Sequence, residues 1–136
     1  MRLLFLLAWV LSAGAQALPS AFLVTGGAFS PTDSPKASEF VSVGKQISGA
    51  TYLLTTIQLA GKETRLYVEG CQRLAQSGPV GLWAYVGLAG SSTTGGVSVG
   101  GMISLHLWKS GGLEAGIRST AAIPRQVQVG LVWEFP

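Results

Sequence analysis

The sequence predicts an all-β fold, an eight-stranded antiparallel up-and-down barrel that crosses a membrane. Three observations predict it. Several segments alternate apolar and polar residues with a period of two, which is typical of β-strands with two different faces. Seven clusters rich in Gly, Ser and Pro separate these segments. A short apolar leader precedes them, which places the rest of the chain outside the cytoplasm.

The alternation is clearest at the C-terminus. Apolar positions there alternate with mostly polar ones, Val127, Val129, Leu131, Trp133 and Phe135 against Gln126, Gln128, Gly130, Val132 and Glu134. Similar alternation runs through 65–73, 97–108 and 113–118. Together with the turn signals it predicts strands at 20–29, 37–48, 50–60, 63–75, 79–89, 96–108, 112–121 and 126–135. Segment 37–48 fits worst, because Lys45 shares a face with Val41 and Val43, so we expect a β-bulge near Gly44.

The first 17 residues have the pattern of a secretory signal peptide. Arg2 precedes an apolar stretch at 3–11, and Ala15-Gln16-Ala17 supplies a cleavage site. The apolar stretch is shorter than the roughly 20 residues that a membrane-spanning helix needs. We therefore expect residues 1–17 to be removed and residues 18–136 to form a single domain.

Composition excludes several classes of function. Charged residues make up 11% of the 136, against a typical ~25%, and they are scattered. No basic patch is present that would bind nucleic acid. Cys71 is the single cysteine and His106 the single histidine, so the chain lacks the residues for an internal disulfide or a Cys- or His-based metal cluster. We expect no cofactor and no metal.

Alternation alone does not say which face points inward. A secreted β-sandwich would bury the apolar face, whereas a membrane barrel turns it toward lipid. Eight strands of about ten residues fit the mature length and favour the barrel. Small residues on the polar face, Gly81, Gly87, Gly100, Gly116 and Gly130, would help a narrow barrel to close. Aromatic residues near predicted strand ends, at the membrane interface, are Tyr52, Trp83, Tyr85, Trp108, Trp133 and Phe135.

The barrel assigns a role to each face. The lipid face would include Leu66, Val68, Val97, Val99, Ile103, Leu105, Leu107, Ile117, Val127, Val129, Leu131 and Trp133. The lumen would hold Gly, Ser, Gln and a charge network of Arg65, Glu69, Arg73, Glu114, Arg118 and Glu134. Three acids and three bases suit a closed lumen, because buried charges need partners. Eight strands leave no wide channel, so a general porin is excluded.

The last strand resembles the closing strand of bacterial outer-membrane β-barrels. Residues 130–135, Gly-Leu-Val-Trp-Glu-Phe, follow the alternating Val127 and Val129 and end on an aromatic residue, although Pro136 comes after it. The resemblance implies that Leu131, Trp133 and Phe135 carry the signal read by the barrel-assembly machinery. It also implies a bacterial outer-membrane location, with outer-membrane lipids as partners.

One set of residues could carry chemistry. Ser104 and His106 share a face of one predicted strand, and Glu114 lies on the polar face of the next. Such a set could activate a serine, and outer-membrane lipid A deacylases are small barrels with a related His-x-Ser pair. Here the order is reversed, and the i, i+2 spacing of about 7 Å is long for a Ser–His hydrogen bond. We therefore expect a non-enzymatic protein.

The predicted function is that of a small outer-membrane barrel with a structural, adhesive or small-ligand-binding role. The first alternative is a secreted, soluble β-sandwich that acts as a binding module. The second is an outer-membrane lipid hydrolase that uses Ser104.

Overall fold

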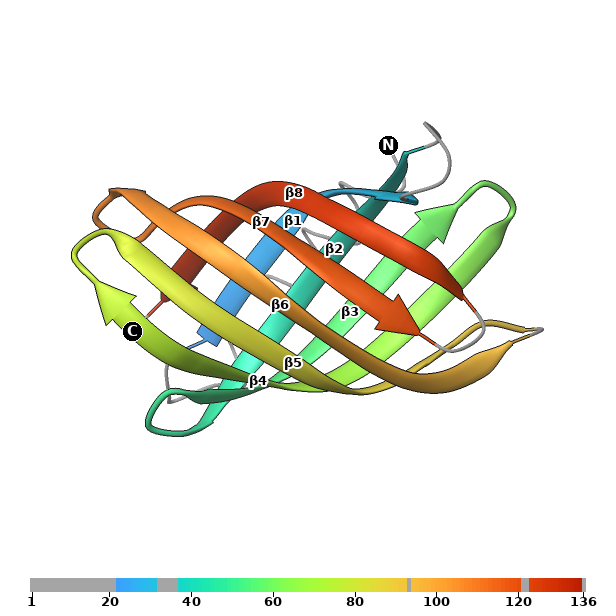
Figure 1. The fold of residues 1–136 in the computed structure, drawn as a ribbon, viewed down its shortest axis with the longest axis horizontal. Coiled ribbons are helices and arrows are strands. Elements are labelled where there is room, and N and C mark those ends of the chain that lie inside the picture. Colours follow the sequence, from blue (N-terminus) through green and yellow to red (C-terminus); the bar gives the residue numbers. More distant parts are fainter. Residues whose placement is uncertain (1–21, 32–36, 93, 121–122, 136) are drawn as a thin grey trace.

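The computed structural model describes residues 22–31, 37–92, 94–120 and 123–135, and they form a closed antiparallel β-barrel (Figure 1). The strands are β1 (Phe22–Pro31), β2 (Ser38–Ser48), β3 (Thr51–Ala60), β4 (Glu63–Ser77), β5 (Val80–Gly90), β6 (Gly95–Trp108), β7 (Gly111–Thr120) and β8 (Ile123–Phe135). The predicted barrel is confirmed, and the alternative of a two-sheet sandwich is wrong because one sheet closes on itself. The predicted signal peptide lies outside the described residues.

Each strand pairs with its neighbours in sequence, and β1 closes the barrel against β8. The closing register runs from Phe22 opposite Phe135 to Pro31 opposite Gln126. The predicted strand limits agree with the observed ones to within three residues. Tight turns explain this agreement, since Gly49, Gly61 and Gly78 adopt positive φ angles of 50°, 63° and 56°, which glycine tolerates without strain.

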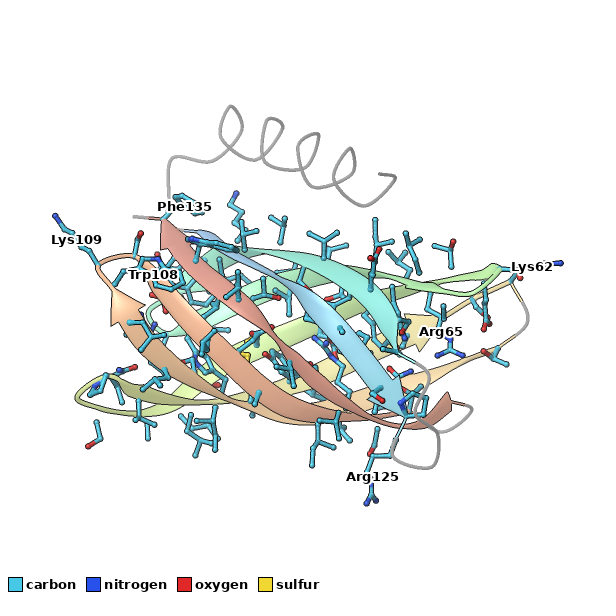
Figure 2. All side chains as sticks on the ribbon, turned by 90° about the horizontal axis from the view of Figure 1, so that it is seen from above. Lys62, Arg65, Trp108, Lys109, Arg125 and Phe135 are labelled. Atoms are coloured by element: carbon cyan, nitrogen blue, oxygen red, sulfur yellow. The ribbon has the colours of Figure 1, made fainter. Side chains whose placement is uncertain are left out.

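The barrel has two ends with different connections. The turn end carries the connections after β2, β4 and β6, together with the start of β1 and the end of β8. The loop end carries the connections after β1, β3, β5 and β7. Figure 2 shows Trp108, Lys109 and Phe135 at the turn end and Lys62, Arg65 and Arg125 at the loop end. Within the described part of the chain, no helix is long and apolar enough to cross a membrane.

The bulge expected near Gly44 is not there. Gly44 pairs regularly with Leu23 on one side and Leu54 on the other. The register of the β2–β3 pair shifts later, between Gln46 and Ser48, where the strand enters its turn. Lys45 therefore stays on the same face as the valines of β2. It lies close to the end of the strand, where a long side chain reaches water without a change of register.

The two faces of the sheet differ as the alternation predicts. Large apolar side chains are exposed on the outside, among them Leu66, Val68, Val97, Val99, Ile103, Leu105, Leu107, Ile117, Val127, Val129 and Leu131. Charged and amide side chains are buried inside, including Glu69, Glu114, Arg118, Gln58, Gln126 and Gln128.

Three aromatic residues expected at the membrane interface lie inside the barrel instead. Tyr52, Trp83 and Tyr85 are all buried in one lumenal cluster with Leu23, Leu54 and Met102. Along β5, Trp83 and Tyr85 are separated from Gly81 and Gly87 by even numbers of residues. Because every second residue of a strand points to the same face, all four point into the lumen. Of the predicted interface residues, Trp108 does lie exposed at the turn end, with its ring 6.2 Å from that of Trp133.

Candidate functional site: the polar lumen

The centre of the lumen is built around an ion pair between β4 and β7. Arg118 Nη2 lies 2.8 Å from Glu69 Oε1, and Arg118 Nε donates a hydrogen bond to Glu69 Oε2 at 3.2 Å. Ser98 Oγ donates to the same carboxylate at 2.9 Å, and Arg118 Nη1 donates to Gln128 Oε1 at 2.8 Å. The two charged side chains are 2% and 0% exposed, so their contacts replace water almost completely.

Aromatic rings surround the Arg118 guanidinium. Its carbon atom Cζ lies 4.6 Å from the ring centroid of Tyr85, 5.2 Å from that of Phe29 and 5.3 Å from that of Tyr67. A cation within about 6 Å of an aromatic face is attracted to it, most strongly where water is excluded. The rings and the ion pair are all buried and form one packed layer of the lumen.

Inward-facing glycines make room for these long side chains. Gly87 pairs with Glu69, and Gly100 pairs with Arg118. A Cβ at Gly87 would collide with the backbone of β4, and one at Gly100 would collide with the carbonyl of Ile117. The predicted role of the lumenal glycines is therefore local: they allow neighbouring strands to approach closely beside the bulkiest buried residues.

Glu114 lies in the same part of the lumen and has fewer partners. Gln128 Nε2 donates to its Oε1 at the long distance of 3.5 Å. Its Oε2 is buried with no hydrogen-bond partner, and Glu114 forms no ion pair within the described segments. Gln128 connects it to the Glu69–Arg118 pair, because Gln128 accepts a hydrogen bond from Arg118 and donates the long one to Glu114.

A second ion pair occupies the turn end of the lumen. Arg73 Nη2 on β4 lies 2.7 Å from Glu134 Oε1 on β8, and Arg73 Cζ lies 4.6 Å above the Trp83 ring. His106 Nε2 approaches the same Glu134 oxygen to 3.8 Å. The Arg73 and Glu134 side chains are 27% and 25% exposed, so water reaches this pair.

The loop end holds the third pair, between neighbouring residues of β4. Arg65 Nε and Nη2 both donate to Glu63 Oε2, at 3.2 and 3.1 Å. The six residues predicted as one charge network therefore divide among three levels of the lumen. Arg118 pairs with Glu69, Arg73 pairs with Glu134, and Arg65 takes a partner that the sequence reasoning did not include.

The candidate catalytic set is not assembled in the structure. Ser104 and Glu114 are cross-strand neighbours, but Ser104 Oγ accepts a hydrogen bond from Trp83 Nε1 at 3.0 Å. His106 approaches Glu134 instead of Ser104, and its Nδ1 has no partner. The described residues also contain no group of three or more His, Cys, Asp or Glu side chains that could hold a metal ion.

The residues of the proposed assembly signal lie along the closing strand. Leu131 pairs with Gly26, Trp133 with Val24 and Phe135 with Phe22, all on the β1–β8 seam. Leu131 is exposed on the outer face, and Trp133 is half-buried beside Trp108.

The sequence predicts Ser and Gln in the lumen, but it does not identify which amide and hydroxyl side chains hydrogen-bond to one another there. Tyr67 Oη donates to Gln58 Oε1 at 2.6 Å, and Ser42 Oγ lies 2.6 Å from Thr56 Oγ1. All four lie at alternate, inward-facing positions of β2, β3 and β4. The alternation of the strands is the signal that could have identified them.

Comparison with known proteins supports the fold. A protein from work on the de novo design of transmembrane β-barrels matches with a TM-score of 0.75 and 13% identity, over 86% of this chain and 97% of its own. The de novo designed protein TMB2.3, solved by NMR in solution, matches with a TM-score of 0.72 and 15% identity, over 89% of this chain and 98% of its own. No protein-family model matches the sequence, and no curated protein matches it.

Proposed function

We propose that this protein is a non-enzymatic β-barrel of the bacterial outer membrane with a structural, adhesive or small-ligand-binding role and a lumen closed by its own side chains. The observation that carries the proposal is the polarity of the barrel, which is apolar outside and charged inside. A water-soluble barrel needs the opposite arrangement.

The outer face supports contact with lipid. Val86 and Leu88 on β5 are 61% and 65% exposed, and each neighbouring strand presents apolar side chains beside them. A continuous apolar surface of this kind is rare on soluble monomers and marks a membrane or protein contact. The band runs along several strands, which fits a bilayer better than a single protein partner.

The height of the apolar band agrees with a membrane. On β6 the outward residues from Val97 to Leu107 are ten residue steps apart, which corresponds to about 33 Å along the strand. A strand tilt of about 40° reduces this length to about 25 Å along the barrel axis, close to the apolar band of outer-membrane barrels. Lys109 lies beyond one end of the band and Lys62 beyond the other (Figure 2).

Two surfaces of the barrel, the apolar band and the last strand, would contact different partners. Outer-membrane lipids would contact the apolar band. The barrel-assembly machinery would read Leu131, Trp133 and Phe135 on β8, as the resemblance of the last strand to bacterial closing strands implies. The exposed Trp108 would anchor the turn end at the lipid–water interface.

A lysine scan of one strand tests the membrane assignment. Ile103→Lys, near the middle of the band, should destabilise the folded barrel in lipid vesicles by about 2–4 kcal/mol. Val97→Lys, equally exposed but close to the loop end, should cost only about 0–1 kcal/mol. Urea unfolding followed by tryptophan fluorescence measures both.

Cell fractionation and gel mobility complete the test. The wild-type protein should appear in the outer-membrane fraction and should migrate differently before and after boiling. Soluble protein, or equal unfolding free energies for the two lysine variants, would refute the membrane assignment. Rapid sugar uptake by vesicles containing the protein would refute the closed lumen.

A further inference from the structure

A pocket, here called the cup, lies at the loop end of the lumen. It encloses about 490 Å³, within the usual range for small-molecule sites. Its polar lining comes from Ser38, Gln58, Arg65 and Gln126, and its apolar lining includes Pro31 and Ala37. These residues belong to β1, β2, β3, β4 and β8 or lie beside them, so the closed sheet positions the whole cup.

Hydrogen-bonded side chains and stacked rings form the floor of the cup. Tyr67 Oη donates to Gln58 Oε1 at 2.6 Å and lies 3.3 Å from Gln126 Oε1. Gln58 Nε2 in turn donates to Ser38 Oγ at 2.6 Å. The stacked rings of Phe29 and Phe40, 4.3 Å apart, pack with Tyr67 in the same buried cluster. A molecule in the cup therefore meets fixed polar groups, with the Arg118 layer beyond them.

The lining offers hydrogen-bond donors. Arg65 uses Nε and Nη2 on Glu63 and also hydrogen-bonds to the Tyr67 side chain, and its five N–H groups leave further donors for another acceptor. The single hydrogen of the Tyr67 hydroxyl is directed to Gln58 Oε1 at 2.6 Å, and Gln126 Oε1 lies farther away at 3.3 Å. Among the described side chains, none accepts a hydrogen bond from the Gln126 amide nitrogen. Among the described residues that line the cup, Arg65 is the only charged one, and Glu63 pairs with its guanidinium at 3.1 Å.

We propose that this loop-end cup binds a small organic carboxylate. The carboxylate would accept hydrogen bonds from the remaining N–H groups of Arg65 and from the Gln126 amide, and its hydrocarbon part would contact Pro31 and Ala37. Arginine suits this role because its planar donors match a carboxylate. The proposal specifies the ligand for the small-ligand-binding role proposed above, and it requires only the closed barrel.

A ligand titration tests the cup directly. The probe is 4-fluorobenzoate, followed by fluorine NMR with the full-length barrel in detergent micelles. Arg65→Gln should weaken binding about tenfold or more, the loss expected when a charge-assisted hydrogen bond worth about 1.4 kcal/mol or more is removed. Lys62→Gln is the matched control, since it removes an equal charge from the same end while its side chain points away from the barrel (Figure 2). It should bind as the wild type does.

A second variant and two further compounds test the contacts of the carboxylate. Gln126→Leu should weaken binding while leaving Arg65 in place. The neutral 4-fluorobenzyl alcohol should bind at least tenfold more weakly than 4-fluorobenzoate, and glucose should not displace the carboxylate. Equal affinity of the wild type and Arg65→Gln, or displacement by glucose, would overturn the proposal.

Folding and membrane insertion of each variant are measured separately from ligand binding. Heat-dependent gel mobility shows whether each variant is folded, and only folded variants are titrated. If the folded wild-type barrel does not bind 4-fluorobenzoate saturably, the carboxylate-binding proposal is refuted and the membrane assignment is not affected. A protein that binds the probe but is not found in membranes refutes the membrane assignment alone.

Discussion

The centre and the turn end of the lumen contain the same kind of ion pair in different surroundings. Arg118 and Glu69 approach to 2.8 Å at the centre, and Arg73 and Glu134 approach to 2.7 Å at the turn end. The central pair is enclosed by three aromatic rings and has extra hydrogen bonds from Ser98 and to Gln128. The pair at the turn end is about one quarter exposed.

The difference teaches that distance alone does not set the importance of an ion pair. At the centre, each charge has lost its water, so the loss of one partner leaves the other without compensation. At the turn end, water can solvate whichever charge remains. The three levels of the lumen should therefore respond very differently to the removal of one arginine.

The largest effect should come from Arg118→Met. It leaves Glu69 as a buried charge without its ion-pair partner, and we expect a loss of about 3–5 kcal/mol in the free energy of unfolding. Urea unfolding in lipid vesicles measures the change. The double variant Arg118→Met/Glu69→Leu removes both charges and should recover most of that loss. A double variant as unstable as the single one would show that packing, and not the lone charge, dominates.

A smaller effect should follow from crowding the same layer. Gly100→Ala places a methyl group against the carbonyl of Ile117 beside Arg118, and should cost about 1–3 kcal/mol. Gly101→Ala is the control, because its methyl group points outward and lies 3.4 Å from the Trp83 carbonyl, an ordinary contact. The same unfolding assay compares the two, and equal losses would show that the inner glycine has no special role.

The smallest effect should come from Arg73→Gln at the turn end. The variant loses a partly exposed ion pair and a contact with the Trp83 ring, together worth about 1 kcal/mol or less. Its loss should also shrink with added salt, whereas that of Arg118→Met should not. A loss of several kcal/mol for Arg73→Gln would mean that the turn end is as dry as the centre.

The sequence was enough to predict the strands, the barrel and the direction of the charged residues. Period-two alternation and turn glycines are local signals, so segments such as 96–108 could be placed to within one residue. The pairing of the charges could not be predicted. Glu69 and Arg118 are 49 residues apart, and they meet only because register and closure bring β4 and β7 into one lumen.

Two errors have a local cause. The aromatic character of Trp83 and Tyr85 favours the membrane interface, whereas their place in the alternation of β5, on the same side as the inward glycines, predicts the lumen. A bulge near Gly44 would move Lys45 off the apolar face, but the position of Lys45 close to the strand end already gives its ammonium group access to water. In both cases the simple alternation was the better guide.

The β1–β8 seam has a consequence for how the chain reaches this structure. Seven of the strand pairings join neighbours in sequence, whereas this one joins Phe22 to Phe135. Until it forms, the sheet keeps two open edges whose backbone groups can pair with another chain. Closing such a long segment costs chain entropy before any contact of the seam compensates for it. We therefore expect closure of the β1–β8 seam to be slow, and its completion removes both open edges of the sheet.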